Sequence, residues 1–219
     1  MKKILAITLI FGCILTSYGQ KRKKNPYHTE GTKEYTEVTS KLIGLWNIDS
    51  FGKKKDEKMG TLYDKATVEF KAFNDREYGG KAIFRFDIPR SIIDERIAAW
   101  NKKDATLAVD SYVVVVTVDY GIHKKGDLVY FESHINQPEI KGSGEQLTNF
   151  QATETGFITS QSEMKESGGL GNLAAAKFMK AVTGTDFVPK IPTQVNYKNL
   201  TETSVDLVSL QKLNFKLTK

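Results

Sequence analysis

Glu132 and His134 are the residues whose types and spacing come nearest to a metal site. They lie two positions apart, so on a strand both side chains would face the same side and could supply two ligands. No third ligand stands at a recognisable spacing, and this favours a surface pair at the exit of a strand. We therefore expect no metal site.

Two further patterns bear on catalysis. The glycine-rich residues 167–171 could approach a phosphate, but they lack the preceding strong strand and the Lys-Ser/Thr of a phosphate loop, which favours a hinge. Acyl transfer has no anchor either, because there is no Gly-X-Ser-X-Gly elbow and the single cysteine, Cys13, lies in an N-terminal apolar run. We expect no enzyme activity, no catalytic residue and no cofactor.

The N-terminus has the three parts of an export signal. Lys2 and Lys3 precede an apolar run over residues 4–15, and small residues follow just before Gln20. The apolar run is shorter than the roughly 20 residues of a spanning helix, so we predict a cleaved signal peptide over residues 1–19 and no membrane-spanning segment. The predicted location is periplasmic or extracellular. A loose lipobox ending at Cys13 leaves anchoring as a lipoprotein open as an alternative.

Residues 20–40 are polar and are predicted to form a flexible basic leader. The chain carries a formal charge of +6, and loss of Lys2 and Lys3 with the signal lowers it to +4. Much of this excess lies in Lys21, Arg22, Lys23 and Lys24. A solvated arm is the simpler interpretation, and contact with an envelope protein or an anionic surface is the alternative. Without interleaved aromatic residues, the arm does not indicate nucleic-acid binding.

Residues 41–219 are predicted to form a single all-β domain with two short helices. Alternating apolar residues and β-branched runs predict strands along most of this range. The expected strands cover residues 44–49, 67–73, 83–88, 112–118, 128–133, 146–152, 156–160, 194–198, 204–210 and 212–217. The helices are expected near residues 91–100 and 172–183, where apolar residues recur at helical spacing.

The residues that open the first strand, Gly44-Leu45-Trp46, resemble the start of lipocalin-like domains found in exported bacterial proteins. Residues 199–207 resemble the turn and strand that close such domains. The resemblance implies an antiparallel up-and-down β-barrel in which Trp46 closes one end. It also implies a cation from the last strand against the tryptophan. Lipocalins commonly use arginine there, and in this chain Lys216 is our predicted partner.

Aromatic residues would face the interior of such a barrel. Small eight-stranded barrels either fill their interior with side chains or leave room for one ligand. The resemblance implies an exported, non-enzymatic protein that binds a small apolar or amphipathic ligand. The alternative is an envelope structural or interaction protein whose barrel is filled and which acts through its surface. The candidate cavity residues are Phe70, Phe84, Phe86, Tyr112 and Tyr130.

Overall fold

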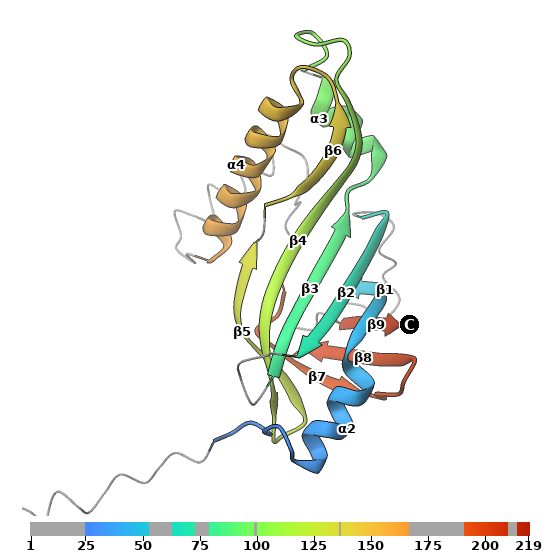
Figure 1. The fold of residues 1–219 in the computed structure, drawn as a ribbon, viewed down its shortest axis with the longest axis vertical. Coiled ribbons are helices and arrows are strands. Elements are labelled where there is room, and N and C mark those ends of the chain that lie inside the picture. Colours follow the sequence, from blue (N-terminus) through green and yellow to red (C-terminus); the bar gives the residue numbers. More distant parts are fainter. Residues whose placement is uncertain are drawn as a thin grey trace, which may run out of the picture.

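The protein is seen in a computed structural model that describes residues 25–52, 63–72, 79–98, 100–135, 137–166, 191–209 and 214–219. Among these residues, nine antiparallel strands form one sheet (Figure 1). The elements are α2 (Lys33–Leu42), β1 (Gly44–Gly52), β2 (Lys65–Ala72), β3 (Gly79–Asp87), α3 (Arg90–Ala98), β4 (Ala108–His123), β5 (Asp127–Ile135), β6 (Glu139–Ser143), α4 (Leu147–Glu166), β7 (Gln194–Lys198), β8 (Ser204–Ser209) and β9 (Asn214–Thr218).

Eight of these strands close into an antiparallel barrel. The order is β3-β2-β1-β9-β8-β7-β5-β4, and β4 pairs back onto β3 to complete the ring. Leaving β6 aside, each barrel strand pairs with the strands before and after it in the chain, so the topology is up-and-down. The predicted fold class is confirmed. The last strand, β9, pairs with the first, β1, so the two ends of the domain meet in the sheet.

Period-two alternation selects the residues that enter the barrel. Val68 and Phe70 of β2 lie opposite Phe84 and Ala82 of β3, and all four are fully buried. The chain passes very close to itself where β3 begins. A methyl group on Gly79 would overlap the carbonyl oxygen of Tyr120, and the next residue is also glycine. Glycine is therefore required at this approach.

The longest strand, β4, extends beyond the barrel. Its partner β3 ends where Asp87 pairs with Val113, whereas residues 108–113 of β4 pair with β6. Figure 1 shows α3 and α4 beside this extension. The helices extend the apolar core of the barrel to it with Ile93, Ile97, Phe150 and Ile158, all of which are buried. The predicted helix near residues 91–100 is confirmed by α3, and the one near 172–183 lies outside the described residues.

The leader predicted over residues 20–40 is wrong for its last part, because α2 begins at Lys33. The hydroxyl oxygen of Thr32 accepts a hydrogen bond from the backbone N–H of Tyr35 and caps the helix. Tyr35, Val38 and Leu42 are buried on one face. That helical spacing was present in the sequence, but the surrounding lysines and glutamates gave the stretch a polar composition.

The strands predicted at residues 146–152 and 156–160 are also wrong, because residues 147–152 and 156–160 belong to α4. The buried face of α4 carries Phe150, Glu154 and Ile158, each four residues from the next. A carboxylate therefore occupies the middle of this face, so the apolar repeat that marks a helix is interrupted. The short strand β6 was not predicted. It buries only Ile140, which is too little alternation to recognise.

Asp104 holds the start of α4 in place. One carboxylate oxygen accepts hydrogen bonds from the backbone N–H and the hydroxyl of Thr106, at 2.8 Å and 2.6 Å. The other accepts from the backbone N–H of Gln146 at 3.0 Å. These bonds, that of the Thr106 hydroxyl first, lower the pKa of the Asp104 carboxyl. A carboxylate at this position also complements the positive end of the helix dipole.

Replacing Asp104 with asparagine is expected to lower stability at neutral pH, and the deficit should shrink in acid. A lowered folded-state pKa contributes stability above the ordinary carboxyl value, and this contribution is lost as the pH falls from about 3.8 through the lowered value. Urea unfolding of both proteins at about pH 7 and about pH 3 measures it. The matched control is Asp110→Asn, at an exposed position on β4. If the stability lost by Asp104→Asn were the same at both pH values, it would contradict a lowered pKa of Asp104 in the folded protein.

Candidate functional site

The barrel interior holds three of the predicted cavity residues, Phe70, Phe84 and Phe86, each 0% exposed. Their rings contact one another and other aromatic rings. The Phe84 ring lies parallel to that of Phe86 with centroids 6.3 Å apart, and 6.1 Å from that of Phe215. Tyr63 packs on Phe86 with ring centroids at 4.8 Å. These separations lie in the range in which aromatic pairs attract.

A second ring pair lies nearer the α2 end of the barrel. The rings of Phe70 and Tyr120 meet edge to face at 5.6 Å, and both residues are 0% exposed. A ring that lined an open cavity would keep exposed surface toward it, and these rings keep none. The buried rings of the barrel strands therefore contact other aromatic rings and keep almost no exposed surface.

The other two predicted cavity residues have different outcomes. The side chain of Tyr130 lies outside the described part of the chain. Tyr112 is buried, but its hydroxyl donates a hydrogen bond to Oε2 of Glu154 at 3.1 Å, so it contacts α4 where β4 leaves the barrel. The Tyr112 ring thus lies between the barrel and α4, and its hydroxyl is hydrogen-bonded to Glu154.

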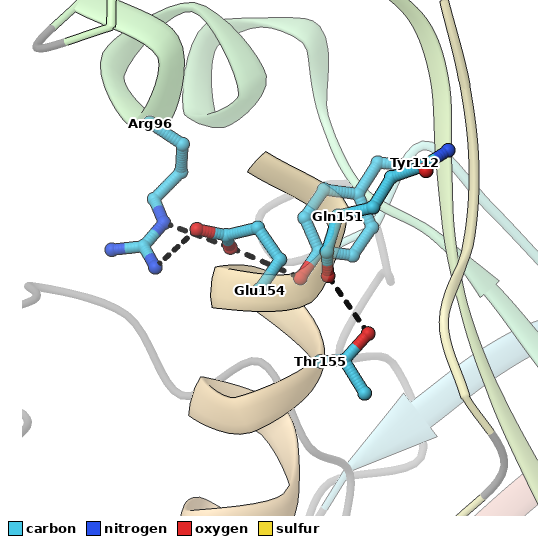
Figure 2. A network of polar contacts seen from close by, with 5 residues as sticks. All are labelled: Arg96, Tyr112, Gln151, Glu154 and Thr155. Carbon is cyan, nitrogen blue, oxygen red and sulfur yellow. Dashed lines mark hydrogen bonds and ion pairs between the residues drawn. The ribbon is translucent and has the colours of Figure 1, made fainter. Parts of the chain in front are cut away.

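A partly buried ion pair links α3 to α4 beside Tyr112. Figure 2 shows Arg96 and Tyr112 approaching Glu154 from two sides. The Arg96 guanidinium donates to both carboxylate oxygens of Glu154, at 2.7 Å and 3.1 Å. It also lies over the ring of Phe157, with 4.4 Å between its carbon and the ring centroid. Glu154 is 2% exposed and the Arg96 side chain 21%, so the carboxylate is shielded from water and the guanidinium is partly exposed. Sequence reasoning missed Arg96 and Glu154 altogether.

The electrostatics of this network keep Tyr112 neutral. Burial raises the pKa of the Tyr112 phenol far above its ordinary range, and the neighbouring Glu154 carboxylate raises it further. The phenol is therefore a hydrogen-bond donor at every physiological pH. Because both oxygens of Glu154 already accept hydrogen bonds from Arg96 and Tyr112, the carboxylate holds α3, α4 and β4 together. These three residues therefore form a structural contact, because both carboxylate oxygens of Glu154 are already bonded to protein donors.

The closed end of the barrel is built around Trp46, which is fully buried. Its indole N–H donates to the carbonyl oxygen of Leu42 at 2.7 Å, which joins β1 to the end of α2. The ammonium group of Lys219 lies 4.5 Å from the Trp46 ring centroid and donates to the carbonyl oxygens of Lys41 and Ile43. Gly44 lies between helix and strand with a φ of +122°, which favours glycine.

The predicted lid residue, Lys216, is wrong, and Lys219 occupies that place. Phe215 and Leu217 are buried, so the residue between them must point outward, and Lys216 is exposed. Lys219 follows the end of β9 and can turn back over Trp46. The sequence alone was sufficient to exclude Lys216 as the partner of Trp46, because period-two alternation places it on the face opposite Phe215 and Leu217.

Replacing Lys219 with alanine is expected to lower the free energy of unfolding by about 0.5 to 1 kcal/mol, the usual size of an exposed cation–π contact. Lys216→Ala is the matched control, since it removes the same side chain from the same strand end without touching Trp46. Urea unfolding followed by tryptophan fluorescence measures both variants. Equal losses in the two variants would contradict a specific contact with the indole.

Other candidate sites in the described residues are sparse. His134 is exposed, and the described part of the chain holds no group of three or more His, Cys, Asp or Glu side chains that could bind a metal ion. No helix within the described ranges combines the length and apolar character needed to cross a membrane.

Fold and interior together define the class of this protein as a closed eight-stranded antiparallel β-barrel with a helical layer against one extended strand. Comparison with known proteins found no matching family model, no matching curated protein and no matching solved structure.

Proposed function

We propose that this protein is an exported, non-enzymatic, lipocalin-like barrel whose interior is filled by its own side chains and which acts through its outer surface. The lipocalin-like assignment is supported by the up-and-down order of the strands and by the closed end. There, the Gly44-X-Trp46 pattern opens β1 and a lysine from the other end of the domain covers the indole. The proposed export rests on the signal pattern over residues 1–19.

The observation that carries the proposal is the contact among Phe84, Phe86 and Phe215 inside the barrel. A small-molecule site occupies a cleft or cavity of about 300–1,000 Å³. To admit a ligand of that size between these rings, the barrel would have to separate side chains that are 0–2% exposed. This favours a barrel filled by its own side chains over a barrel that binds a small ligand.

The filled interior predicts that the protein purified from the cell envelope carries no small apolar molecule and takes up none. Native mass spectrometry of the purified protein, alone and after addition of a long-chain fatty acid or benzene, measures both. Leu207→Ala supplies a positive control, because Leu207 is fully buried on β8 and an apolar void of this kind binds benzene.

We expect benzene binding by the Leu207→Ala variant and none by the natural protein. One fatty acid bound per natural protein, or a copurifying ligand, would overturn the filled barrel and support a ligand-binding function. If the variant does not fold, the measurements on the natural protein still decide between the two functions.

A further inference from the structure

The first residues that the structure describes are attached to the end of β4. This end extends beyond the start of β3, and Tyr27 forms an antiparallel bridge there with His123, the last residue of β4. The backbone N–H of His28 donates a hydrogen bond to the carbonyl oxygen of Ile122 at 2.9 Å. Residues 25–28 therefore take the place of a neighbouring strand at this edge, and they are here called the strap.

Lys124, in the turn between β4 and β5, holds the strap from the other side of the bridge. Its backbone N–H donates to the carbonyl oxygen of Pro26, and its ammonium group donates to the carbonyl oxygen of Asn25, both at 2.9 Å. All four strap residues keep exposed surface. Ordering such a segment costs about as much free energy as a few hydrogen bonds contribute. The strap is therefore close to the balance between attached and released, and one lost hydrogen bond shifts that balance.

The imidazole of His123 supports both the turn and the strap. Its Nδ1 accepts a hydrogen bond from the backbone N–H of Lys125 at 3.2 Å. This bond spans the turn residue Lys124, whose donors hold the strap. The ring also meets the ring of Tyr27 edge to face, with 5.7 Å between the centroids. Nδ1 can accept a hydrogen bond only while it carries no proton, so both roles belong to the neutral imidazole.

The charged and titratable groups that flank His123 come from the strap, from the turn and from the start of β5. They are Tyr27, His28, Lys124, Lys125 and Asp127. The two lysines are exposed and oppose a positive charge on the imidazole, whereas Asp127, opposite His123 in the hairpin, attracts it. A proton on Nδ1 therefore removes the bond to the backbone of Lys125 and favours movement of the ring away from the turn.

We propose that protonation of His123 releases residues 25–28, which makes them an acid-sensitive strap over the end of β4. Histidine is the side chain that ordinarily gains its charge between about pH 5 and pH 8. The lost acceptor loosens the turn that aims the donors of Lys124 at the strap. Release uncovers the carbonyl oxygen of Ile122 at a sheet edge, where another extended segment can pair. The inference goes beyond the proposed function and does not depend on how the barrel interior is filled.

Amide hydrogen exchange followed by NMR tests the strap in protein purified from an expressing cell, its N-terminus read by mass spectrometry. The amides of His28 and Lys124 report on it, since they are the two backbone donors of the bridge. Their protection, corrected for the intrinsic exchange rate, is expected to fall about three- to tenfold from about pH 7.5 to about pH 5.5. The amide of Val118, buried in the barrel wall, should keep its protection.

His123→Asn separates the imidazole from the rest of the turn. An asparagine side chain also accepts a hydrogen bond from the backbone N–H two residues on, but it does not titrate. We expect this variant to protect the strap amides equally at both pH values. His28→Gln is the matched control, because it removes the other histidine of the bridge, and it should keep the response to acid.

An acid response that persists in His123→Asn, or that disappears in His28→Gln, would assign the change to another group and overturn the proposal. Strap amides that exchange freely at both pH values would overturn it as well, because the strap would then not be attached. A parallel loss of protection at Val118 would mean that acid unfolds the barrel as a whole, which also contradicts a separate strap. None of these outcomes concerns the uptake of benzene or fatty acid, so the inference can fail without the proposed function.

Discussion

Replacing Glu154 with alanine is expected to lower the free energy of unfolding by about 2 to 3 kcal/mol, because the buried Tyr112 hydroxyl and the partly exposed Arg96 guanidinium both lose a charged hydrogen-bond acceptor. Arg96 would lose both hydrogen bonds to the carboxylate, and Tyr112 would lose the acceptor of its hydroxyl. Urea unfolding followed by circular dichroism measures the loss. Because the contact joins α3, α4 and β4, we also expect faster amide hydrogen exchange in both helices.

The matched control is Glu95→Ala, which removes the same side chain from an exposed position next to Arg96. Surface substitutions of this kind change stability by about 0.5 kcal/mol or less. The paired replacement Arg96→Met with Glu154→Leu separates charge from packing, since apolar substitutes for both partners often restore or exceed the original stability. A Glu154→Ala variant as stable as the Glu95→Ala control would contradict the structural role of the network.

Replacing Phe84 with alanine is expected to cost about 3 to 5 kcal/mol, the usual loss for a large-to-small change of a buried aromatic residue. The ring of Phe84 contacts those of Phe86 on the same strand and Phe215 on β9, so the substitution removes one ring contact within β3 and one between strands. The closed barrel limits how far the neighbouring strands can collapse into the void. Equilibrium unfolding in urea gives the difference in free energy.

Lys81→Ala is the control for Phe84→Ala, because Lys81 is an exposed residue of the same strand. We expect it to change stability by about 0.5 kcal/mol or less. A small loss for Phe84→Ala would mean that its ring already borders open space, and this would favour the ligand-binding barrel. The experiment therefore bears on function as well as on stability.

The strands of the barrel were predictable because their pattern is local. On β2 and β3 each inward residue has an inward partner two positions away, as with Phe84 and Phe86, and the pattern holds whatever the partner strand is. The closing pair of β9 and β1 agrees with the family resemblance at both ends of the domain. Predicted strand ends in β7, β8 and β9 differ from the observed ones by a few residues at most.

The helices were less predictable where their buried faces carry polar residues. In α4 the central buried position is Glu154, and in α2 Thr39 is buried among Tyr35, Val38 and Leu42. Thr39 can be buried because its hydroxyl donates to the carbonyl oxygen of Tyr35. Glu154 can be buried only because Arg96 lies beside it, 58 residues away in the chain. A short stretch of sequence around Thr39 contains its partner Tyr35, whereas a short stretch around Glu154 does not contain Arg96.

By itself the sequence determined that the domain consists mainly of strands, because period-two alternation assigns each strand residue to one face without knowledge of the neighbouring strand. The closed up-and-down barrel was an expectation of the lipocalin-like resemblance. The sequence also determined the opening Gly44-X-Trp46 and the inward aromatic residues Phe70, Phe84 and Phe86. Only the tertiary structure decided that these rings contact one another, that Lys219 covers the tryptophan, and that Arg96, Tyr112 and Glu154 meet. Such contacts join residues far apart in the chain, and their geometry exists only once the barrel has closed.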